Sequence, residues 1–295
     1  MNYQWYPGHM TKAIRMMQEN LKLVDMIIEI TDARIPISGR NPDIDELGKN
    51  KFRLIILNKA DLGDPKVNRL WTDYYSKKGI QIIEMDSRSK ASVKEVKNKV
   101  QIACAAKIER DKRKGIINRP VRAMVAGIPN VGKSTFINIM SGKASAKTGN
   151  KPGVTRGKQW IALGDQIQML DTPGILWPKF DDEITGLRIA LIGSMNDENF
   201  DTDDLAVSLI RELNKNYPSV ITSYYNISEN QLDELLDSGE YIAREGAILG
   251  MIAKNRNLLA QGARLDYSRA AAMLLDDFRN GRLGRISLER PEDNE

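Results

Sequence analysis

Residues 127–134 read GIPNVGKS, which matches the pattern GxxxxGK[ST] of a phosphate-binding loop. The stretch follows the β-branched run 121–126 and precedes a helical pattern over 135–140, the context that such a loop requires. Its glycines allow backbone N–H groups to surround phosphate oxygens at the start of a helix. We expect Lys133 to reach the terminal phosphates and the Ser134 hydroxyl to bind Mg²⁺. The residues predicted to bind the phosphates are Asn130, Val131, Gly132, Lys133, Ser134 and Thr135.

A second motif, Asn58-Lys59-Ala60-Asp61, follows the apolar run 54–57. An aspartate carboxylate can accept hydrogen bonds from the ring N–H and the amino group of guanine, whereas adenine offers no such pair of donors. Four residues at the end of a strand are by themselves an ordinary polar loop. Together with a phosphate-binding loop they predict that these four residues bind a guanine nucleotide.

A third motif, Asp171-Thr172-Pro173-Gly174, follows the apolar run 166–170. At the end of a strand, Asp171 is expected to hold the Mg²⁺ shell through water, and the Gly174 amide is expected to meet the terminal phosphate. Thr155 is the candidate switch threonine for Mg²⁺. The loop 86–89 is placed to contact guanine through Asp86 and Ser87, although Arg88 stands where alanine is usual.

Composition excludes several classes of protein. The chain has 295 residues, of which 41% are hydrophobic and 28% charged, and its net charge is +5. These values are typical of a globular protein, and the small basic excess favours an anionic partner. The one cysteine, Cys104, can form neither an intramolecular disulfide nor a cysteine-based zinc site. The N-terminus has no apolar signal core, and apolar runs such as 54–57 are far shorter than a membrane span, so we expect a cytoplasmic protein without stable membrane association. We also expect a monomer.

The order of the apolar runs predicts an α/β fold. Short β-branched runs alternate with helical patterns, for example over 93–106, which is typical of a doubly wound, mostly parallel sheet. The runs 160–163 and 167–170 flank Gly164-Asp165 and predict a hairpin with an antiparallel edge strand. Ligands bind such sheets beyond the carboxyl ends of the strands.

Helical periodicity replaces the strand pattern from about residue 185. We therefore predict a nucleotide-binding domain over 1–180, an all-α domain over 181–285 and a tail over 286–295. Residues 290–295 are expected to fray.

The three motifs resemble those of small GTPases, but their order is rotated, because the guanine motif precedes the phosphate loop. A doubly wound sheet can be rejoined in this way when its original termini lie close together. The combination looks like the circularly permuted Ras-like GTPases. The N-terminal stretch 5–13, WYPGHMTKA, narrows the resemblance to the bacterial ribosome biogenesis GTPase A group, in which a helical domain follows the GTPase domain.

The resemblance implies slow GTP hydrolysis by the chain alone. Ras-type GTPases orient the attacking water with a glutamine after the DxxG glycine, and that position is Ile175 here. Two candidates remain for assistance. His9 could accept a hydrogen bond from the water, or it could be structural. Asn130 stands where related GTPases coordinate K⁺, and its alternative role is to shape the phosphate loop.

The resemblance also implies a partner, the large ribosomal subunit late in its assembly. Basic stretches over 107–122, 141–160 and 241–290 suit contact with the phosphate backbone of rRNA. The candidates in the helical domain are Arg244, Lys254, Arg256 and Arg264. The switch segments 143–156 and 171–177 lie next to that domain in sequence, so the nucleotide state could set its orientation.

Two alternatives stay open from the sequence. One is a GTP-regulated module that acts on a protein or a membrane without any RNA role. The other is a metabolic P-loop enzyme such as a kinase, in which Asn58-Lys59-Ala60-Asp61 is a coincidence.

Overall fold

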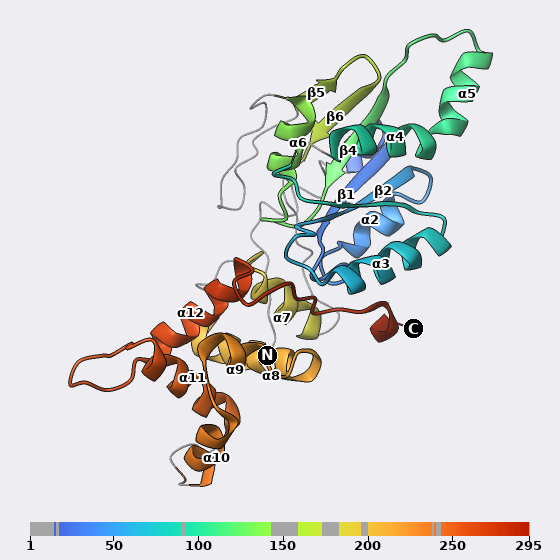
Figure 1. The fold of residues 1–295 in the computed structure, drawn as a ribbon. Helices are drawn as coiled ribbons and strands as arrows, with labels where there is room; N and C mark the ends of the chain where they lie inside the picture. Colours follow the sequence, from blue (N-terminus) through green and yellow to red (C-terminus); the bar gives the residue numbers. More distant parts are fainter. Residues whose placement is uncertain are drawn as a thin grey trace. The chain divides into compact units, whose positions relative to one another are not determined.

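The chain folds into two compact units in the computed structural model (Figure 1). The structure describes residue 15 and residues 18–89, 92–142, 159–172, 183–195, 200–237, 239 and 243–294. The first unit comprises residues 1–186 together with 289–295, and the second comprises residues 187–288. The chain therefore leaves the first unit once and returns to it for its last residues.

The described strands of the first unit form one six-stranded sheet in the order β3-β2-β1-β4-β6-β5. β1, β2, β3, β4 and β6 are parallel, and β5 runs antiparallel to β6 at the edge. This confirms the predicted mostly parallel sheet with its antiparallel edge hairpin. The chain adds strands to one side of β1 and then to the other, so the topological switch point lies between β1 and β4. The strands are β1 (Met26–Asp32), β2 (Phe52–Asn58), β3 (Gln81–Met85), β4 (Val121–Ala126), β5 (Gln159–Leu163) and β6 (Ile167–Asp171).

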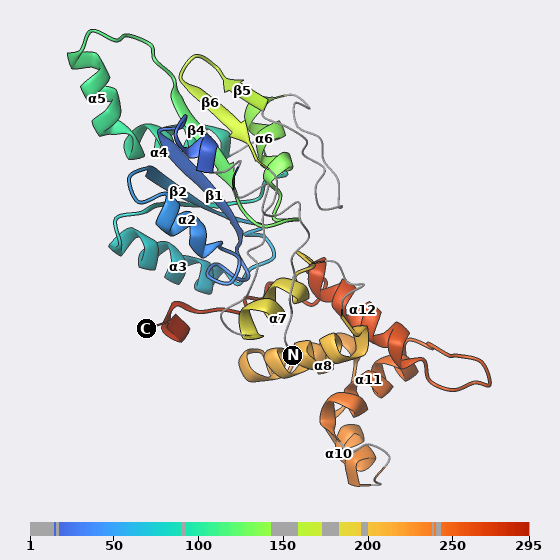
Figure 2. The same cartoon turned by 180° about the vertical axis from the view of Figure 1, so that it is seen from behind.

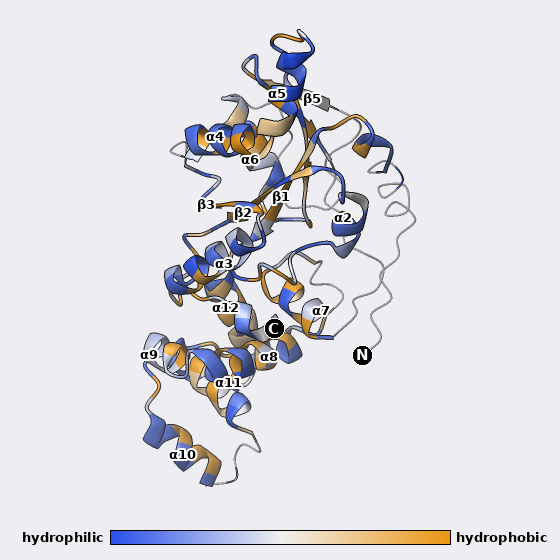
Figure 3. Cartoon of the chain, turned by 90° about the vertical axis from the view of Figure 1, so that its right-hand side faces the viewer, coloured by the Kyte–Doolittle hydropathy of each residue, from blue (hydrophilic) through white to orange (hydrophobic). Residues whose placement is uncertain are grey.

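The central strands are buried on both faces, as their continuous apolar runs require. On one face, Trp71 and Tyr75 pack against Ile55, Leu57 and Ile82. Figure 3 shows β1 in hydrophobic colours between more hydrophilic helices. The helices of this unit are α2 (Pro42–Leu47), α3 (Pro65–Lys77), α4 (Val93–Ala103), α5 (Ala105–Arg113) and α6 (Lys133–Ser141).

A C-terminal clasp, formed by Glu289 with Ile37, Ser38 and Trp71, attaches the end of the chain to the first unit. The Glu289 carboxylate is 1% exposed and accepts from the Ile37 amide at 2.7 Å, the Ser38 amide at 3.0 Å and the Ser38 hydroxyl. The Trp71 indole N–H donates to the Glu289 carbonyl at 3.2 Å. Pro291 is buried as well, and residues Pro291–Asn294 form the 3₁₀ helix η3. The expectation of a frayed tail is thus wrong for residues 290–294, because a buried carboxylate anchors the chain just before them.

We expect Glu289→Ala to lower the free energy of unfolding by about 3 kcal/mol, because two buried donors of Ser38 and the partly buried Ile37 amide lose a charged acceptor. Urea denaturation measures this loss. Glu292→Ala is the matched control, since Glu292 is exposed in the same tail and should change the free energy by less than about 0.5 kcal/mol. Equal effects of the two substitutions would contradict the clasp.

The second unit is all-helical in its described residues, as predicted. Its core joins α8, α11 and α12, and the Tyr225 hydroxyl donates to the buried Asp277 carboxylate at 2.6 Å. The Arg279 guanidinium donates to the carbonyls of Ala190 and Leu191 at 2.8 and 3.0 Å, which satisfies the end of α7. The helices are α7 (Glu183–Leu191), which begins in the first unit, α8 (Thr202–Asn216), α9 (Val220–Tyr225), α10 (Glu229–Asp237), α11 (Arg244–Asn255) and α12 (Tyr267–Arg279).

Two further details differ from the sequence-based expectations. The helical pattern over 93–106 is two helices that meet at Cys104, which is buried with its Sγ 3.6 Å from the Met26 Sδ. The sequence did not predict the short helix α9, because its residues VITSYY are mostly β-branched or aromatic and have low helix propensity.

The compact units divide at 186/187 and 288/289, a few residues after the predicted domain limits at 180/181 and 285/286.

Candidate functional site

The loops that carry the sequence motifs share one edge of the sheet. β2, β3, β4 and β6 are parallel, so their carboxyl ends lie at the same edge. The loops that leave these ends begin at Lys59, Asp86, Gly127 and Thr172. This edge is where doubly wound sheets bind their ligands.

Two glycines give the phosphate loop a backbone path that other residues cannot follow. Gly127 has φ +152°, and a Cβ on it would lie 2.3 Å from the Ile30 carbonyl oxygen. Gly132 caps the start of α6 with φ +96°, and a Cβ there would lie 2.4 Å from the Asn58 Nδ2. Both distances are far below van der Waals contact, so the pattern GxxxxGK[ST] is enforced by space as well as by backbone conformation.

Asn58 connects three of the predicted loops through one side chain. Its Nδ2 donates to the Val131 carbonyl at 2.6 Å, and its Oδ1 accepts from the Ser87 amide at 2.9 Å. The residue is 2% exposed. The guanine motif, the phosphate loop and the loop after β3 are therefore held together by two buried hydrogen bonds.

Lys133 lies in the interior of the phosphate loop. Its Nζ donates to the Ile128 carbonyl at 2.6 Å, and the residue is 8% exposed. Burial lowers the pKa of Lys133 to about 8, and the negative charge of Asp171 opposes this shift. The ammonium group thus carries a desolvation cost that a bound phosphate anion would offset.

We expect nucleotide affinity to fall as the pH rises above 8. Bound phosphates favour the charged ammonium and raise its pKa, so binding takes up a proton where the free protein has lost one. The dissociation constant for Mg²⁺·GDP should therefore rise about tenfold from pH 7 to pH 9. Calorimetry in two buffers of different ionisation enthalpy measures the uptake directly. The Lys133→Arg variant should show no such uptake, because a guanidinium stays charged; a pH-independent affinity of the wild-type protein would contradict the assignment.

The carboxylate and hydroxyl oxygens in the loops around Lys133 are of the kind that binds a hard cation such as Mg²⁺. Asp171 is 3% exposed at the end of β6, and the Thr172 hydroxyl donates to the Val125 carbonyl at 2.5 Å, which joins this loop to β4. Ser134 lies in the first turn of α6. Carboxylate and hydroxyl oxygens are the ligands that Mg²⁺ prefers, with phosphates and waters completing its shell. Among the described residues, no group of three or more His, Cys, Asp or Glu side chains could hold a metal by itself.

The guanine side of the site carries a charged cluster. The Asp61 carboxylate forms an ion pair with the Arg88 guanidinium, and the same guanidinium pairs with Asp86 at 2.9 Å. Arg88 raises the stability of the charged Asp86 through its side-chain hydrogen bond, which lowers the pKa of Asp86. Two carboxylates and one guanidinium thus contact one another in the loops that the sequence assigns to guanine.

Similarity to known proteins identifies the family to which this chain belongs. A family model described as "50S ribosome-binding GTPase" matches residues 122–237. Ribosome biogenesis GTPase A of Bacillus cereus is 42% identical over 98% of this chain and 94% of its own length. The chain belongs to the ribosome biogenesis GTPase A family. The Thermotoga maritima protein of the same name is 30% identical over 98% of this chain and 95% of its own length.

A solved structure agrees with this assignment. The GDP-bound structure of TM YlqF matches with a TM-score of 0.67 and 25% identity, covering 95% of this chain and 100% of its own. This member of the ribosome biogenesis GTPase A family is therefore a GTP hydrolase with a circularly permuted GTPase domain, as the rotated order of its motifs predicted.

The sequence did not predict that Lys59 forms an ion pair with the buried Asp32. Arg34 pairs with both oxygens of Asp32 at 2.9 Å, and the Lys59 Nζ lies 3.1 Å from the Asp32 Oδ2. Burial alone would raise the pKa of Asp32, but the positive charges of Arg34 and Lys59 hold it well below its usual value. The sequence feature that could have predicted this contact is the Asp-x-Arg spacing of Asp32 and Arg34 at the end of β1. Asp32 pairs in register with Asn58, the residue before Lys59.

Several predicted site residues lie outside the described part of the chain. These are His9, Thr155, Gly174 and Ile175. The other predicted guanine and phosphate residues lie at one edge of the sheet, in a strand end, a loop or a helix start. They are Asn58, Lys59, Ala60, Asp61, Asp86, Ser87, Asn130, Val131, Gly132, Lys133, Ser134 and Thr135.

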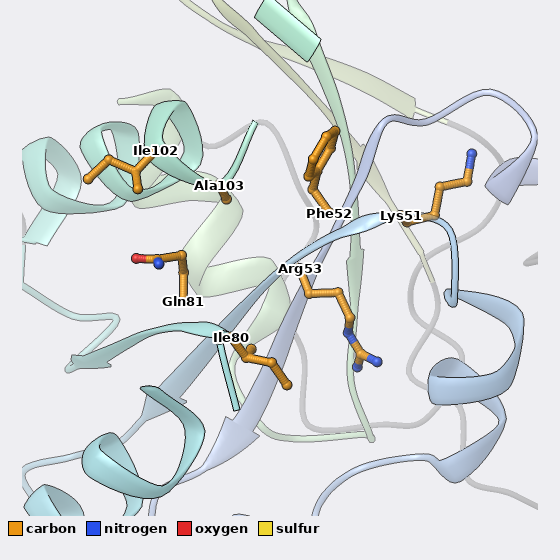
Figure 4. A pocket seen from close by; sticks show the side chains of 8 residues that line it. Lys51, Phe52, Arg53, Ile80, Gln81, Ile102 and Ala103 are labelled. Carbon is orange, nitrogen blue, oxygen red and sulfur yellow. The ribbon is translucent and has the colours of Figure 1, made fainter. Parts of the chain in front are cut away.

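A cavity of about 410 Å³ lies elsewhere in the same unit (Figure 4). Its lining comes from the start of β2, including Phe52 and Arg53, the start of β3 and the end of α4. The starts of parallel strands are at the edge opposite the motif loops, so this cavity does not belong to the nucleotide site. In the part of the chain that the structure describes, no helix is long and apolar enough to cross a bilayer.

Proposed function

We propose that this chain hydrolyses GTP on the precursor of the large ribosomal subunit and leaves it after a late assembly step. The nucleotide half of the proposal is supported by Asn58, whose two buried hydrogen bonds hold the guanine motif to the phosphate loop. The ribosomal half is supported by relatives named ribosome biogenesis GTPase A, which match along nearly the whole chain. We further propose a cytoplasmic monomer.

The proposed roles divide along the nucleotide. Asp61 accepts from the guanine edge, with Lys59 and the Asp86–Ser87 loop beside the base. The backbone amides of residues 130–135 and the Lys133 ammonium hold the phosphates. Ser134, Asp171 and Thr155 would hold Mg²⁺, which when bound neutralises charge on the β- and γ-phosphates. Gly174 is proposed to donate its amide to the γ-phosphate.

Water activation is assigned to two candidates. Asn130 has φ +59° in the phosphate loop, and we propose that it contributes to a K⁺ site there. A K⁺ near the bridging oxygens would do the work of an arginine finger. Replacing K⁺ by Na⁺ should then slow GTP hydrolysis by the wild-type protein. The same replacement should not change the rate of hydrolysis by the Asn130→Ala variant. If His9 acts on the water instead, His9→Ala should lower hydrolysis in both salts equally.

Burial separates the basic residues of the first unit into two groups, and we propose that only the exposed ones contact rRNA. Lys107 is buried between Asp25 and Asp111, so it serves the fold rather than a phosphate. The end of α5 and the loop after it carry exposed cations and extend from the sheet (Figures 1 and 2). Figure 3 shows α5 in hydrophilic colours. The cations are Arg110, Lys112, Arg113, Lys114 and Arg119.

In the second unit, the four predicted cations are not equivalent. Arg244 forms an ion pair with Glu229, and the neighbouring carboxylate weakens the attraction of Arg244 for an rRNA phosphate. The Arg256 Cζ lies 5.5 Å from the centroid of the Tyr224 ring and 5.2 Å from that of the Tyr225 ring. Lys254 and Arg264 are exposed, and Arg264 lies on the extended loop between α11 and α12 (Figure 2). We therefore favour Lys254, Arg256 and Arg264 as phosphate contacts.

Sedimentation with large-subunit precursors tests the ribosomal half. With a non-hydrolysable GTP analogue, the Lys112→Glu/Lys114→Glu variant should bind more weakly, and its salt dependence should flatten by about one unit of log–log slope per lost contact. Lys77→Glu on α3 is the control, since it reverses one exposed charge elsewhere. Binding of the wild-type protein that is insensitive to salt, or no binding, would contradict the proposal and favour a protein or membrane partner.

A further inference from the structure

Arg88 occupies a defined place between two carboxylates. Its backbone amide donates to the Asp86 Oδ1 at 2.9 Å, and its Nε and Nη2 donate to the two oxygens of Asp86 at 2.9 and 3.0 Å. The same Nη2 also donates to the Asp61 Oδ2. Asp86 thus holds the guanidinium in a fixed orientation, with one N–H directed at Asp61.

The guanidinium resembles the part of guanine that Asp61 is proposed to recognise. Both groups are planar and present adjacent N–H donors to a carboxylate. The Asp61 Oδ1 is buried and has no hydrogen-bond partner among the described residues, while Oδ2 holds Arg88. A carboxylate that could accept two donors therefore accepts one, and that one comes from the protein itself.

We propose that Arg88 is an intramolecular competitor of guanine for Asp61, so that the base displaces the guanidinium before it binds. The proposal rests on the proposed role of Asp61 as the guanine acceptor. The Arg88 side chain is 69% exposed, and ion pairs at such positions are weak. The competition should therefore lower nucleotide affinity by a small factor, about two- to fivefold.

Competition before binding has a kinetic signature. Arg88 contacts Asp61 in the free protein and not in the complex, so its removal should raise the association rate constant and leave the dissociation rate constant unchanged. We expect Arg88→Ala to associate with a fluorescent GDP analogue about two to five times faster by stopped flow. Arg88→Lys, which keeps the charge without the planar fork, should lie between Arg88→Ala and wild type. Lys66→Ala, which removes an exposed cation on α3, should behave as wild type.

Salt gives a second readout. The difference between wild type and Arg88→Ala should shrink at high KCl, because ions screen an exposed pair. A faster dissociation of GDP from Arg88→Ala would overturn the proposal, since Arg88 would then contact the bound nucleotide. Equal association rates would overturn it too.

Asp61→Asn separates this proposal from the function on which it rests. If Asp61→Asn leaves GDP affinity unchanged, the assignment of Asp61 to guanine is wrong and the competitor proposal falls with it. If Asp61→Asn loses affinity while Arg88→Ala and wild type associate equally fast, the competitor proposal alone is wrong.

Discussion

Asp61→Asn should lower the affinity for GDP by at least about 100-fold and shift the preference toward xanthosine diphosphate. The wild-type carboxylate can accept from both the ring N–H and the amino group of guanine, and hydrogen bonds to charged groups contribute about 1.5–3 kcal/mol each. An asparagine amide offers one acceptor and one donor. Its donor would face the guanine amino group, but it would match the carbonyl that xanthine has at the same position.

Competition binding with the two diphosphates measures this change. Asp73→Asn is the matched control, because Asp73 is an exposed aspartate on α3 and should leave both affinities unchanged. Retention of guanine preference in Asp61→Asn would show that another group reads the base. A loss of affinity for both nucleotides together with a loss of stability would show a structural role instead.

The second large effect is expected at Gly132. Gly132→Ala should lower GDP affinity at least about 100-fold, because a Cβ would lie 2.4 Å from the Asn58 Nδ2 at a residue with φ +96°. Relief of that contact requires the loop or Asn58 to move, and Asn58 is the side chain that joins the phosphate loop to the loop after β3. Calorimetric titration with Mg²⁺·GDP measures the affinity.

Gly79→Ala separates the clash from the backbone conformation. Gly79 has φ +72°, and a Cβ there would have no neighbour within 4 Å, so its replacement tests positive φ alone. We expect it to cost about 1 kcal/mol of stability and no nucleotide affinity. A similar loss of affinity in both variants would contradict the close approach at Asn58.

Local patterns predicted the sheet and the positions of its loops. The alternation of β-branched runs with helical patterns indicated parallel strands, and parallel strands place the motif loops at one edge. Glycine positions in the phosphate loop could be read directly, because their conformation is local. The hairpin over β5 and β6 was readable for the same reason, from Gly164-Asp165 between two short runs.

Contacts across long sequence distances could not be predicted. Glu289 and Ser38 are separated by 251 residues, and nothing local marks Glu289 as buried. Lys107 belongs to a basic stretch by composition, yet its ammonium lies between Asp25 and Asp111 in the interior. Arg88 was visible as a departure from the usual motif, but its contact with Asp61 depends on the distance between two loops that only the fold brings together.

We propose that the large ribosomal subunit activates GTP hydrolysis, which is slow in the chain alone. The most direct measurement is steady-state GTP turnover of the purified protein with and without large subunits, in K⁺ and in Na⁺. We expect large subunits to raise turnover strongly, and K⁺ to raise it above the level in Na⁺. Turnover that is equal with and without subunits would contradict the claim and leave a GTPase with a different partner.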